Sequence, residues 1–187
     1  MLLVTAPSCS AETPLAASSG ALARIVRVID GDTIKVEIDG REESCRLLGI
    51  DTPELSYGHL TAQLDRLAQH TPEPDRAELA EAIALIRRHA DLAEERAREA
   101  RAALQDIVGG RAVTLVPNTH QPKRDRYGRL LVYVEVNGLD ANAELIRRGL
   151  AIVDERFECD RLDDYVKIQS EAQGNTGTRR NADGAVR

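Results

Sequence analysis

Acidic side chains are concentrated in a single stretch of the sequence, residues 30–54. Asp32 lies near its beginning, Asp51 and Glu54 lie at its end, and Arg46 stands between them. Carboxylate oxygens suit Ca²⁺ or Mg²⁺, and zinc is disfavoured because the sequence has no histidine and cysteine cluster. Arginine presents a planar fork of donors that can take two phosphate oxygens at once. The stretch therefore indicates metal-assisted chemistry on a phosphate group.

Charged residues are spread unevenly over a chain whose net charge is −6. That charge argues against a protein that coats nucleic acid by bulk attraction. Residues 111–136 nevertheless hold five basic and two acidic side chains, whereas residues 21–54 hold five basic and eight acidic ones. A basic loop beside a carboxylate-rich patch would suit phosphate chemistry, although ordinary variation in surface charge gives the same counts.

The segments around these groups show the alternation of β-strands, with Asp-Gly and Asn-Gly pairs as turns. Strands are predicted over residues 23–30, 33–38, 43–50, 111–116 and 130–136. Helical periodicity predicts helices over residues 60–67, 75–108, 141–148 and 162–172.

The second of these helices is unusually long. Asp75 and Glu78 resemble a capping box at its start, and Gly109-Gly110 ends it. Uninterrupted, it would span about 33 residues and roughly 50 Å. Because that exceeds the width of a small barrel, the helix must kink or protrude.

A three-stranded meander, an intervening helix, two strands and a terminal helix form the layout of an OB-type barrel. The expected fold class is α+β, a five-stranded barrel with flanking helices and an inserted helical hairpin. Three motifs occur in order along this layout: Asp30-Gly31-Asp32-Thr33, Arg46-Leu47-Leu48-Gly49-Ile50-Asp51-Thr52-Pro53-Glu54 and Asp125-Arg126-Tyr127-Gly128-Arg129. Each motif alone is typical of a turn, a strand end or a solvated loop. Together they closely resemble the staphylococcal nuclease (thermonuclease-like) family, over most of residues 23–173 apart from about 55–90.

The resemblance implies a metal site and a water-activating group. Asp32, Asp51 and the backbone carbonyl of Thr52 would hold Ca²⁺, with Mg²⁺ as the second choice. Glu54 would activate or orient the attacking water. Members of the family cut the 5′ P–O bond of DNA and RNA with little sequence preference and leave 3′-phosphates.

The resemblance also implies the groups that contact substrate. Arg46 and Arg129 would grip the phosphate, and Tyr127 would line the nucleotide pocket. Lys123 and Arg126 of the basic loop would add positive charge for a DNA or RNA substrate. The leading interpretation is a Ca²⁺-dependent phosphodiesterase of low sequence specificity. The alternative is a catalytically idle OB-fold module that binds nucleic acid or protein, although such modules usually lose a carboxylate or an arginine that is retained here.

Some features depart from the family pattern. An insertion over residues 55–90 follows Glu54, and its apolar stripe needs a partner helix. If residues 60–67 fold back on it, the hairpin would be a lid beside the site; if a second copy pairs with it, the stripe would be a dimer contact. Where the family offers aromatic rings to the base, Asp154-Glu155-Arg156 intervene and Phe157 remains. The terminal helix is expected to end early.

The two ends of the chain are expected to lie outside the domain, which spans residues 21–173. Residues 1–20 are interpreted as a flexible segment, the remnant of an export signal with Cys9 as a candidate lipidation site, so a secreted or envelope location is preferred over a cytoplasmic one. Residues 174–187 are expected to form a frayed tail. No apolar run approaches the roughly 20 residues that a transmembrane helix needs.

Overall fold

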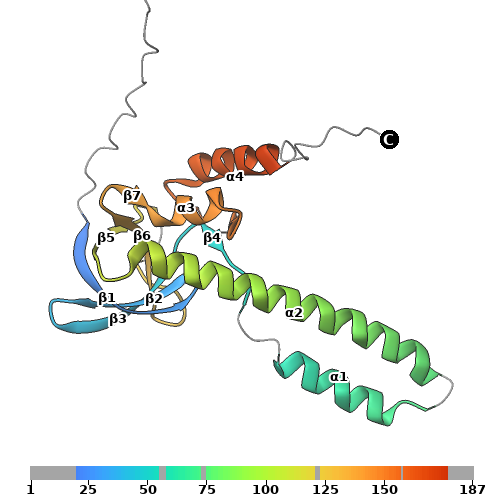
Figure 1. Cartoon of the computed structure of the whole chain (residues 1–187). Coiled ribbons are helices and arrows are strands. Elements are labelled where there is room, and N and C mark those ends of the chain that lie inside the picture. Colours follow the sequence, from blue (N-terminus) through green and yellow to red (C-terminus); the bar gives the residue numbers. More distant parts are fainter. Residues whose placement is uncertain (1–19, 55–57, 73–74, 121–122, 157, 177–187) are drawn as a thin grey trace, which may run out of the picture.

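A closed five-stranded barrel forms the body of the protein in this computed structural model (Figure 1). The structure describes residues 20–54, 58–72, 75–120, 123–156 and 158–176. The barrel strands are β1 (Ala21–Asp30), β2 (Thr33–Ile38), β3 (Arg41–Leu47), β5 (Ala112–Pro117) and β6 (Leu130–Val136). Neighbouring strands pair antiparallel, and a parallel pairing of β3 with β6 closes the barrel. The predicted α+β fold with an OB-type barrel is confirmed.

Two hairpin turns lie where the sequence predicts them. Asp39 and Gly40 join β2 to β3 with φ values of 50° and 75°. Asn137 and Gly138, with φ values of 51° and 80°, join β6 to the short strand β7 (Leu139–Asp140). Positive φ at both central residues matches the right-handed twist of the flanking strands, and Asp-Gly and Asn-Gly pairs adopt it readily.

The third predicted strand, residues 43–50, is wrong at its end. β3 stops at Leu47, and Ile50–Asp51 forms a separate strand, β4, that pairs antiparallel with β8 (Ile152–Val153). The chain turns at Gly49, whose φ of +76° is a conformation that side-chain-bearing residues rarely adopt. The consequence is functional, because the turn takes Asp51 off the barrel and places it beside the segment that follows β8.

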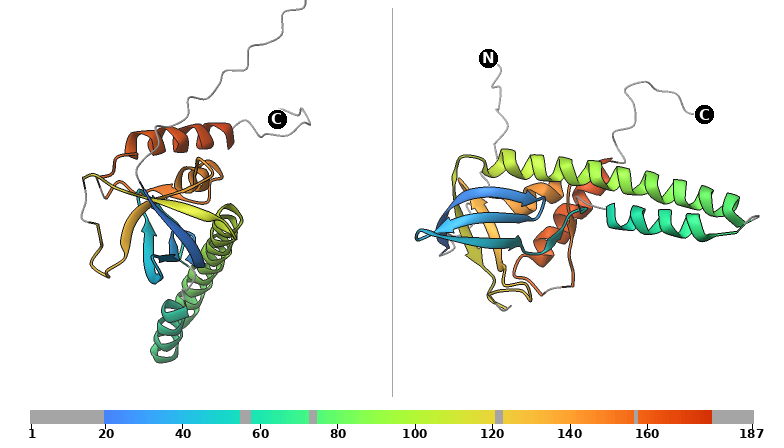
Figure 2. Two further views of the ribbon diagram at one scale, coloured as in Figure 1. Left: turned by 90° about the vertical axis from the view of Figure 1, so that its left-hand side faces the viewer. Right: turned by 90° about the horizontal axis from the view of Figure 1, so that it is seen from below.

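Helix α2 (Asp75–Val108) is both part of the core and a projection from it. Ala97, Ala100 and Leu104 in its second half are fully buried against the barrel. Its first half extends away from the barrel and lies alongside α1 (Gly58–His70) as an antiparallel hairpin (Figures 1 and 2). The prediction that this helix must kink or protrude is confirmed by the protrusion. At the β1–β2 turn, a Cβ on Gly31 would lie 2.7 Å from the Cβ of Ala100, so glycine there lets the turn approach the helix.

Two shorter helices complete the fold, α3 (Ala141–Arg147) and α4 (Leu162–Thr176). The predicted end of the last helix at residue 172 is wrong, since α4 continues to Thr176 and takes in the first residues of the expected tail. The rest of that tail, residues 177–187, and the expected export segment up to residue 19 lie outside the described residues. None of the helices in the described ranges is long and apolar enough to cross a membrane.

A buried ionic network ties α4 to the barrel and to α3. Arg161, whose side chain is 12% exposed, pairs with the carboxylates of Glu135 and Asp140. The Tyr165 hydroxyl donates to Asp140 Oδ2 at 2.9 Å. Asp140 also caps α3, because its Oδ1 accepts from the backbone N–H of Ala143 at 3.1 Å. Arg161 therefore neutralises Glu135 of β6 and Asp140, and Asp140 in turn bonds to both α3 and α4.

Replacing Arg161 by alanine is expected to lower the free energy of unfolding by about 3–5 kcal/mol, the usual effect of removing one partner of a buried ion pair. Urea denaturation measures this loss. Arg24→Ala is the control, because Arg24 pairs with Glu37 at 2.7 Å but is 68% exposed. An exposed pair contributes about 0–1 kcal/mol. Equal losses in the two variants would contradict the structural role of Arg161.

Candidate active site

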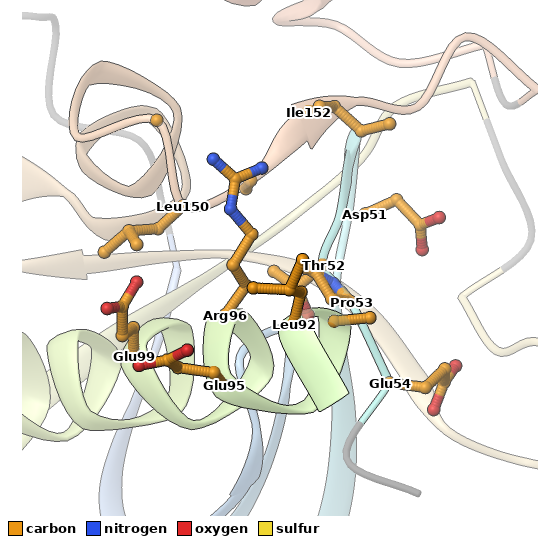
Figure 3. Close-up of a pocket in the computed structure, with 13 residues that line it drawn as sticks. Asp51, Thr52, Pro53, Glu54, Leu92, Glu95, Arg96, Glu99, Leu150 and Ile152 are labelled. Atoms are coloured by element: carbon orange, nitrogen blue, oxygen red, sulfur yellow. The ribbon is translucent and has the colours of Figure 1, made fainter. Parts of the chain in front are cut away.

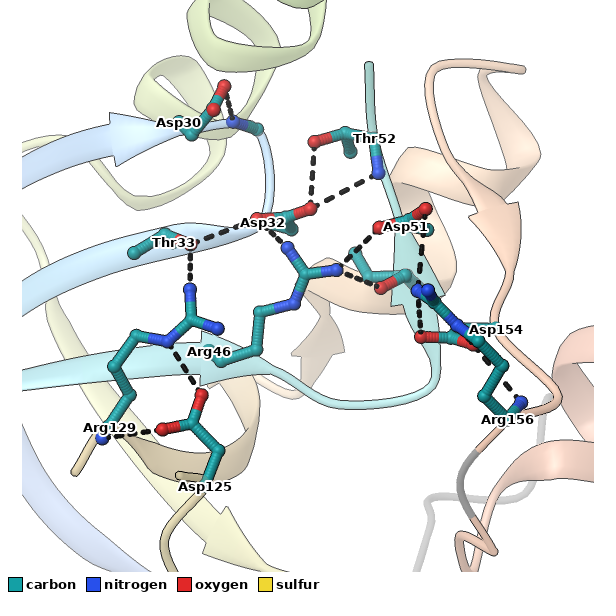
Figure 4. A network of polar contacts seen from close by, with 12 residues as sticks. Asp30, Asp32, Thr33, Arg46, Asp51, Thr52, Asp125, Arg129, Asp154 and Arg156 are labelled. Atoms are coloured by element: carbon teal, nitrogen blue, oxygen red, sulfur yellow. Dashed lines mark hydrogen bonds and ion pairs between the residues drawn. The ribbon is translucent and has the colours of Figure 1, made fainter. Parts of the chain in front are cut away.

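Arg46 lies at the centre of the polar cluster drawn in Figure 4. Its side chain projects from β3, is 17% exposed, and pairs with Asp32 and with Asp51 Oδ1, the latter at 2.6 Å. It also donates to the backbone carbonyl of Ile50 at 3.2 Å. Although burial by itself would lower it, Asp32 and Asp51 hold the pKa of Arg46 above its ordinary value. Two of the predicted metal ligands thus converge on one charged guanidinium.

Asp32 is held in place by the residues on either side of the site. It lies in the β1–β2 turn and is 3% exposed. Its Oδ2 accepts from the backbone N–H and the hydroxyl of Thr52 at 3.1 and 3.0 Å, and its Oδ1 accepts from the Thr33 hydroxyl at 2.9 Å. The sequence predicts Thr52 as a metal ligand through its backbone carbonyl oxygen. The structure adds that the backbone N–H and the hydroxyl of Thr52 hold the carboxylate of Asp32 in place.

The loop before β6 positions the second arginine. Asp125 Oδ1 accepts from the backbone N–H groups of Tyr127 and Arg129, both at 2.9 Å, and its Oδ2 pairs with Arg129 Nε at 2.7 Å. Although burial by itself would raise it, these hydrogen bonds hold the pKa of Asp125 below its ordinary value. Arg129 Nη1 also reaches the hydroxyl of Thr33 at 3.5 Å, so the loop arginine lies beside the turn that carries Asp32.

Glu54 stands at the edge of the site and is exposed. Partial loss of water around its carboxylate and the nearby carboxylates of Asp30, Asp32 and Asp51 raise its pKa, while Arg46 opposes the shift. A carboxylate whose proton affinity is raised is a better general base than an ordinary glutamate. Its position and its electrostatics both suit the predicted role toward water.

A cavity of about 670 Å³ lies beside these groups; Asp51 is among the described residues that line it, whereas Asp32 and Thr52 are not. Its lining includes all three residues of the predicted catalytic set and two of the predicted substrate-binding set: Arg46, Glu54, Arg129, Arg126 and Tyr127. Tyr127 is 68% exposed, and the guanidiniums of Arg126 and Arg129 lie 4.7 and 5.4 Å from its ring centroid. Lys123, the remaining substrate-binding prediction, is exposed and does not line this cavity among the described residues.

A larger cavity, of about 910 Å³, lies on the other side of the segment from Asp51 to Glu54, against helix α2 (Figure 3). Arg96 stands in it between the helix and residues 150–152, but its other charged lining residues are acidic and include Glu95 and Glu99. Its apolar walls come from Leu92 and the segment after α3. Because the net charge of its described lining is negative, it suits an anion less well than the smaller cavity, whose lining includes five arginines.

Sequence reasoning missed two functional candidates, Asp154 and Arg156. Both line the smaller cavity, and Arg156 Nη2 lies 3.6 Å from Asp51 Oδ2. The sequence feature that could have identified them is an acidic and a basic residue two positions apart, in a segment that departs from the family pattern. The ring expected there, Phe157, lies outside the described residues.

None of the described residues that line either cavity belongs to α1. The part of α2 that lines the larger cavity, within positions 92–99, follows the insertion. Leu64 and Ala68 of α1 are half-buried, and Leu67 and Leu85 on the hairpin are exposed. The roles of the insertion as a lid or a dimer contact stay predictions.

The residues at the site fit a hard divalent cation in chemistry. Asp32 and Asp51 offer carboxylate oxygens that already converge on the positive charge of Arg46, and oxygen donors are what Ca²⁺ and Mg²⁺ take. Within the described ranges, no group of three or more histidine, cysteine or acidic side chains forms a ready-made ligand cluster. A cation would therefore complete its ligands with backbone oxygen and water, and would take over carboxylate oxygens that Arg46 now holds.

The protein resembles known nucleases along most of its length. It is 30% identical over 128 residues to the thermonuclease of Staphylococcus hyicus and 31% identical over 127 residues to the endonuclease YncB of Bacillus subtilis. Each alignment covers 68% of this chain, but 56% and 45% of those proteins. The chain thus spans about half the length of these two nucleases.

An archaeal relative matches more of the chain. The protein is 29% identical over 157 residues to MJ1439 of Methanocaldococcus jannaschii, which is described as uncharacterized, and the match covers 81% of this chain and 68% of that protein. Residues 44–177, well over half of the chain, match the family described as staphylococcal nuclease homologue. The chain therefore belongs to the staphylococcal nuclease family.

Proposed function

We propose that this protein is a phosphodiesterase that cleaves DNA and RNA with little sequence specificity, depends on Ca²⁺ and leaves 3′-phosphates. One observation carries the proposal: Arg46, Arg129 and Glu54, from three separate segments, border one cavity beside the carboxylates of Asp32 and Asp51. An idle binding module has no need to keep this set together.

The side chains divide the work between charge and proton transfer. Arg46 and Arg129 would bind the oxygens of the phosphate and counter the charge that grows on them during attack. Arg46 must exchange Asp32 and Asp51 for phosphate oxygens to do so. Glu54 would orient the attacking water and accept its proton.

A cation would be held by Asp32, Asp51 and the backbone carbonyl of Thr52. When bound, it supplies positive charge toward the phosphate. With Asp32, Asp51 and Glu54 at −3 and Arg46 and Arg129 at +2, a divalent cation changes the formal charge of the set from −1 to +1. Binding of the cation and binding of an anionic substrate should therefore reinforce each other.

Low sequence specificity follows from the groups that face the cavity. Arginines bind phosphates without reading bases, and the ring of Tyr127 offers a stacking surface that any base can use. Export of the protein, which rests on residues 1–20, remains part of the proposal. The insertion over residues 55–90 remains a proposed lid or dimer contact.

Purified protein is expected to degrade single-stranded DNA and RNA in Ca²⁺, and the Glu54→Gln variant to cut at least about 100-fold more slowly, since a general base contributes about 10²–10⁴-fold. The products should become substrates for 3′-end extension only after phosphatase treatment. Binding of the same oligonucleotides should be retained in the variant. An unsubstituted protein that binds them without cutting would instead establish the idle module.

A further inference from the structure

Arg156 is an oriented cation that the functions assigned above leave unused. Asp154 holds it by a fork: Oδ1 accepts from Arg156 Nε at 2.7 Å and Oδ2 from Nη2 at 2.9 Å. Oδ1 also accepts from the backbone N–H of Arg156 at 3.1 Å. The Asp154 side chain is 4% exposed, whereas that of Arg156 is 68% exposed. A buried carboxylate thus presents a guanidinium to the solvent of the cavity.

This arrangement is poorly explained as a stabilising ion pair. Exposed ion pairs contribute about 0–1 kcal/mol, and burying a carboxylate opposes that gain. Burial by itself would raise the pKa of Asp154, yet the hydrogen bonds from Arg156 hold it below its ordinary value. The carboxylate therefore stays charged and keeps the guanidinium in one orientation. Such pre-organisation lowers the entropy lost when a ligand binds.

The position of Arg156 indicates what it binds. In Figure 4, Arg46 lies between Arg129 and Arg156, so three guanidiniums stand in a row along the cavity. Asp51 lies between the last two, with its Oδ1 on Arg46 at 2.6 Å and its Oδ2 3.6 Å from Arg156. Cations spaced along one cavity in this way fit successive phosphates of a nucleic-acid strand better than one isolated phosphate group.

We propose that Arg156, positioned by Asp154, binds the phosphate next to the one that is cut, so that the site takes a single strand with at least two phosphates. The proposal rests on the proposed nuclease function for the identity of the site. It adds that a residue from the segment after β8 extends the substrate contacts beyond the scissile phosphate.

Equilibrium binding tests the proposal separately from cleavage. A fluorescein-labelled pentathymidylate is titrated in Ca²⁺ with the Glu54→Gln protein, which is expected to bind but to cut slowly, and anisotropy gives Kd at several salt concentrations. The Arg156 and Arg24 substitutions are made in this Glu54→Gln parent. Removing one phosphate contact to a single strand is expected to reduce the slope of log Kd against log salt by about 0.7. Arg156→Ala should show this reduction and bind about 10-fold more weakly, since hydrogen bonds to charged groups contribute more than neutral ones. Arg156→Lys should keep the slope, because the charge remains.

Arg24→Ala is the matched control. Arg24 has the same 68% exposed side chain and one carboxylate partner, Glu37, but lines neither cavity among the described residues. Its removal should leave the slope unchanged. A larger Kd for Arg156→Ala with an unchanged slope would mean stacking on a base and would overturn the proposal. So would the absence of measurable binding by the Glu54→Gln parent in Ca²⁺.

Cleavage gives the second readout. On a pentanucleotide in Ca²⁺, Arg156→Ala should raise KM about 10-fold with little change in kcat, and on a dinucleotide with a single phosphodiester it should change neither. Equal losses on both substrates would show that Arg156 acts through Asp51 and would overturn the proposal. If Arg156→Ala reduces the salt slope but the unsubstituted protein cuts no substrate, the phosphate contact of Arg156 is supported and the proposed nuclease function fails. If the unsubstituted protein cuts but Arg156→Ala changes neither the salt slope nor the difference between pentanucleotide and dinucleotide, the nuclease function is supported and the contact of Arg156 fails.

Discussion

Cleavage by the Arg46→Ala variant is expected to be about 10²–10³-fold slower than cleavage by the unsubstituted protein, the usual effect of removing one charge-stabilising donor. The side chain is the donor that lies closest to the predicted metal ligands, paired with Asp32 and with Asp51 at 2.6 Å. Its loss removes a fork for the phosphate and leaves two carboxylates facing an anionic substrate. Both effects act in the same direction on kcat/KM, which a continuous assay on a labelled oligonucleotide measures.

Stability must be separated from chemistry in this experiment, because the Asp32 side chain is 5% exposed and depends on Arg46 for its counter-charge. Arg46→Lys restores the charge without the fork, so it should recover most of the unfolding free energy but little of the activity. Arg148→Ala is the control, since Arg148 pairs with Glu144 at 2.8 Å on α3 and is 42% exposed. If the Arg46→Lys protein folds and cuts at the parent rate, a two-point contact of the Arg46 guanidinium with the phosphate is not needed for cleavage.

Local sequence patterns predicted the barrel well because its strands are bounded by turns with specific residues. The Asp-Gly and Asn-Gly pairs at residues 39–40 and 137–138 fixed two hairpins, and alternation located β2 at its observed bounds, Thr33–Ile38. The break at Gly49 was missed because apolar residues, Leu47, Leu48 and Ile50, stand on both sides of it. The parallel closure of β3 on β6 was not predicted in detail, since pairing between distant strands leaves no mark in either strand alone.

The site was predictable in its residue types but not in its contacts. Motifs gave the carboxylates and two arginines; the structure brings both arginines, Asp51 and Glu54 to one cavity, and pairs Asp32 with Arg46 beside it. The pairing of Arg46 with two carboxylates depends on the β4–β8 strand pair, which the sequence did not reveal. Asp154 and Arg156 were set aside because they replaced an expected pattern, although their fork geometry depends only on a spacing of two residues.

Removing divalent cations is expected to abolish cleavage entirely, a larger effect than any single substitution. In the metal-free protein, Asp32 and Asp51 hold Arg46 away from substrate, and the set of three carboxylates and two arginines carries −1. Chelator should therefore stop cleavage, and Ca²⁺ should restore it. Full activity in excess chelator would contradict the prediction that Asp32 and Asp51 hold a cation needed for cleavage.

Binding of the cation can be measured without cleavage, through its effect on unfolding. A ligand present at 100 times its Kd stabilises the folded protein by about 2.7 kcal/mol, so Ca²⁺ should raise Tm in the absence of nucleic acid. Asp51→Asn should lose this response because it removes a charged oxygen ligand. Asp39→Asn is the matched control: Asp39 is exposed at the β2–β3 turn with φ of 50°, which asparagine also tolerates. If both variants respond to Ca²⁺ as the parent does, the ion binds elsewhere, and Asp51 serves only to hold Arg46 and Arg156.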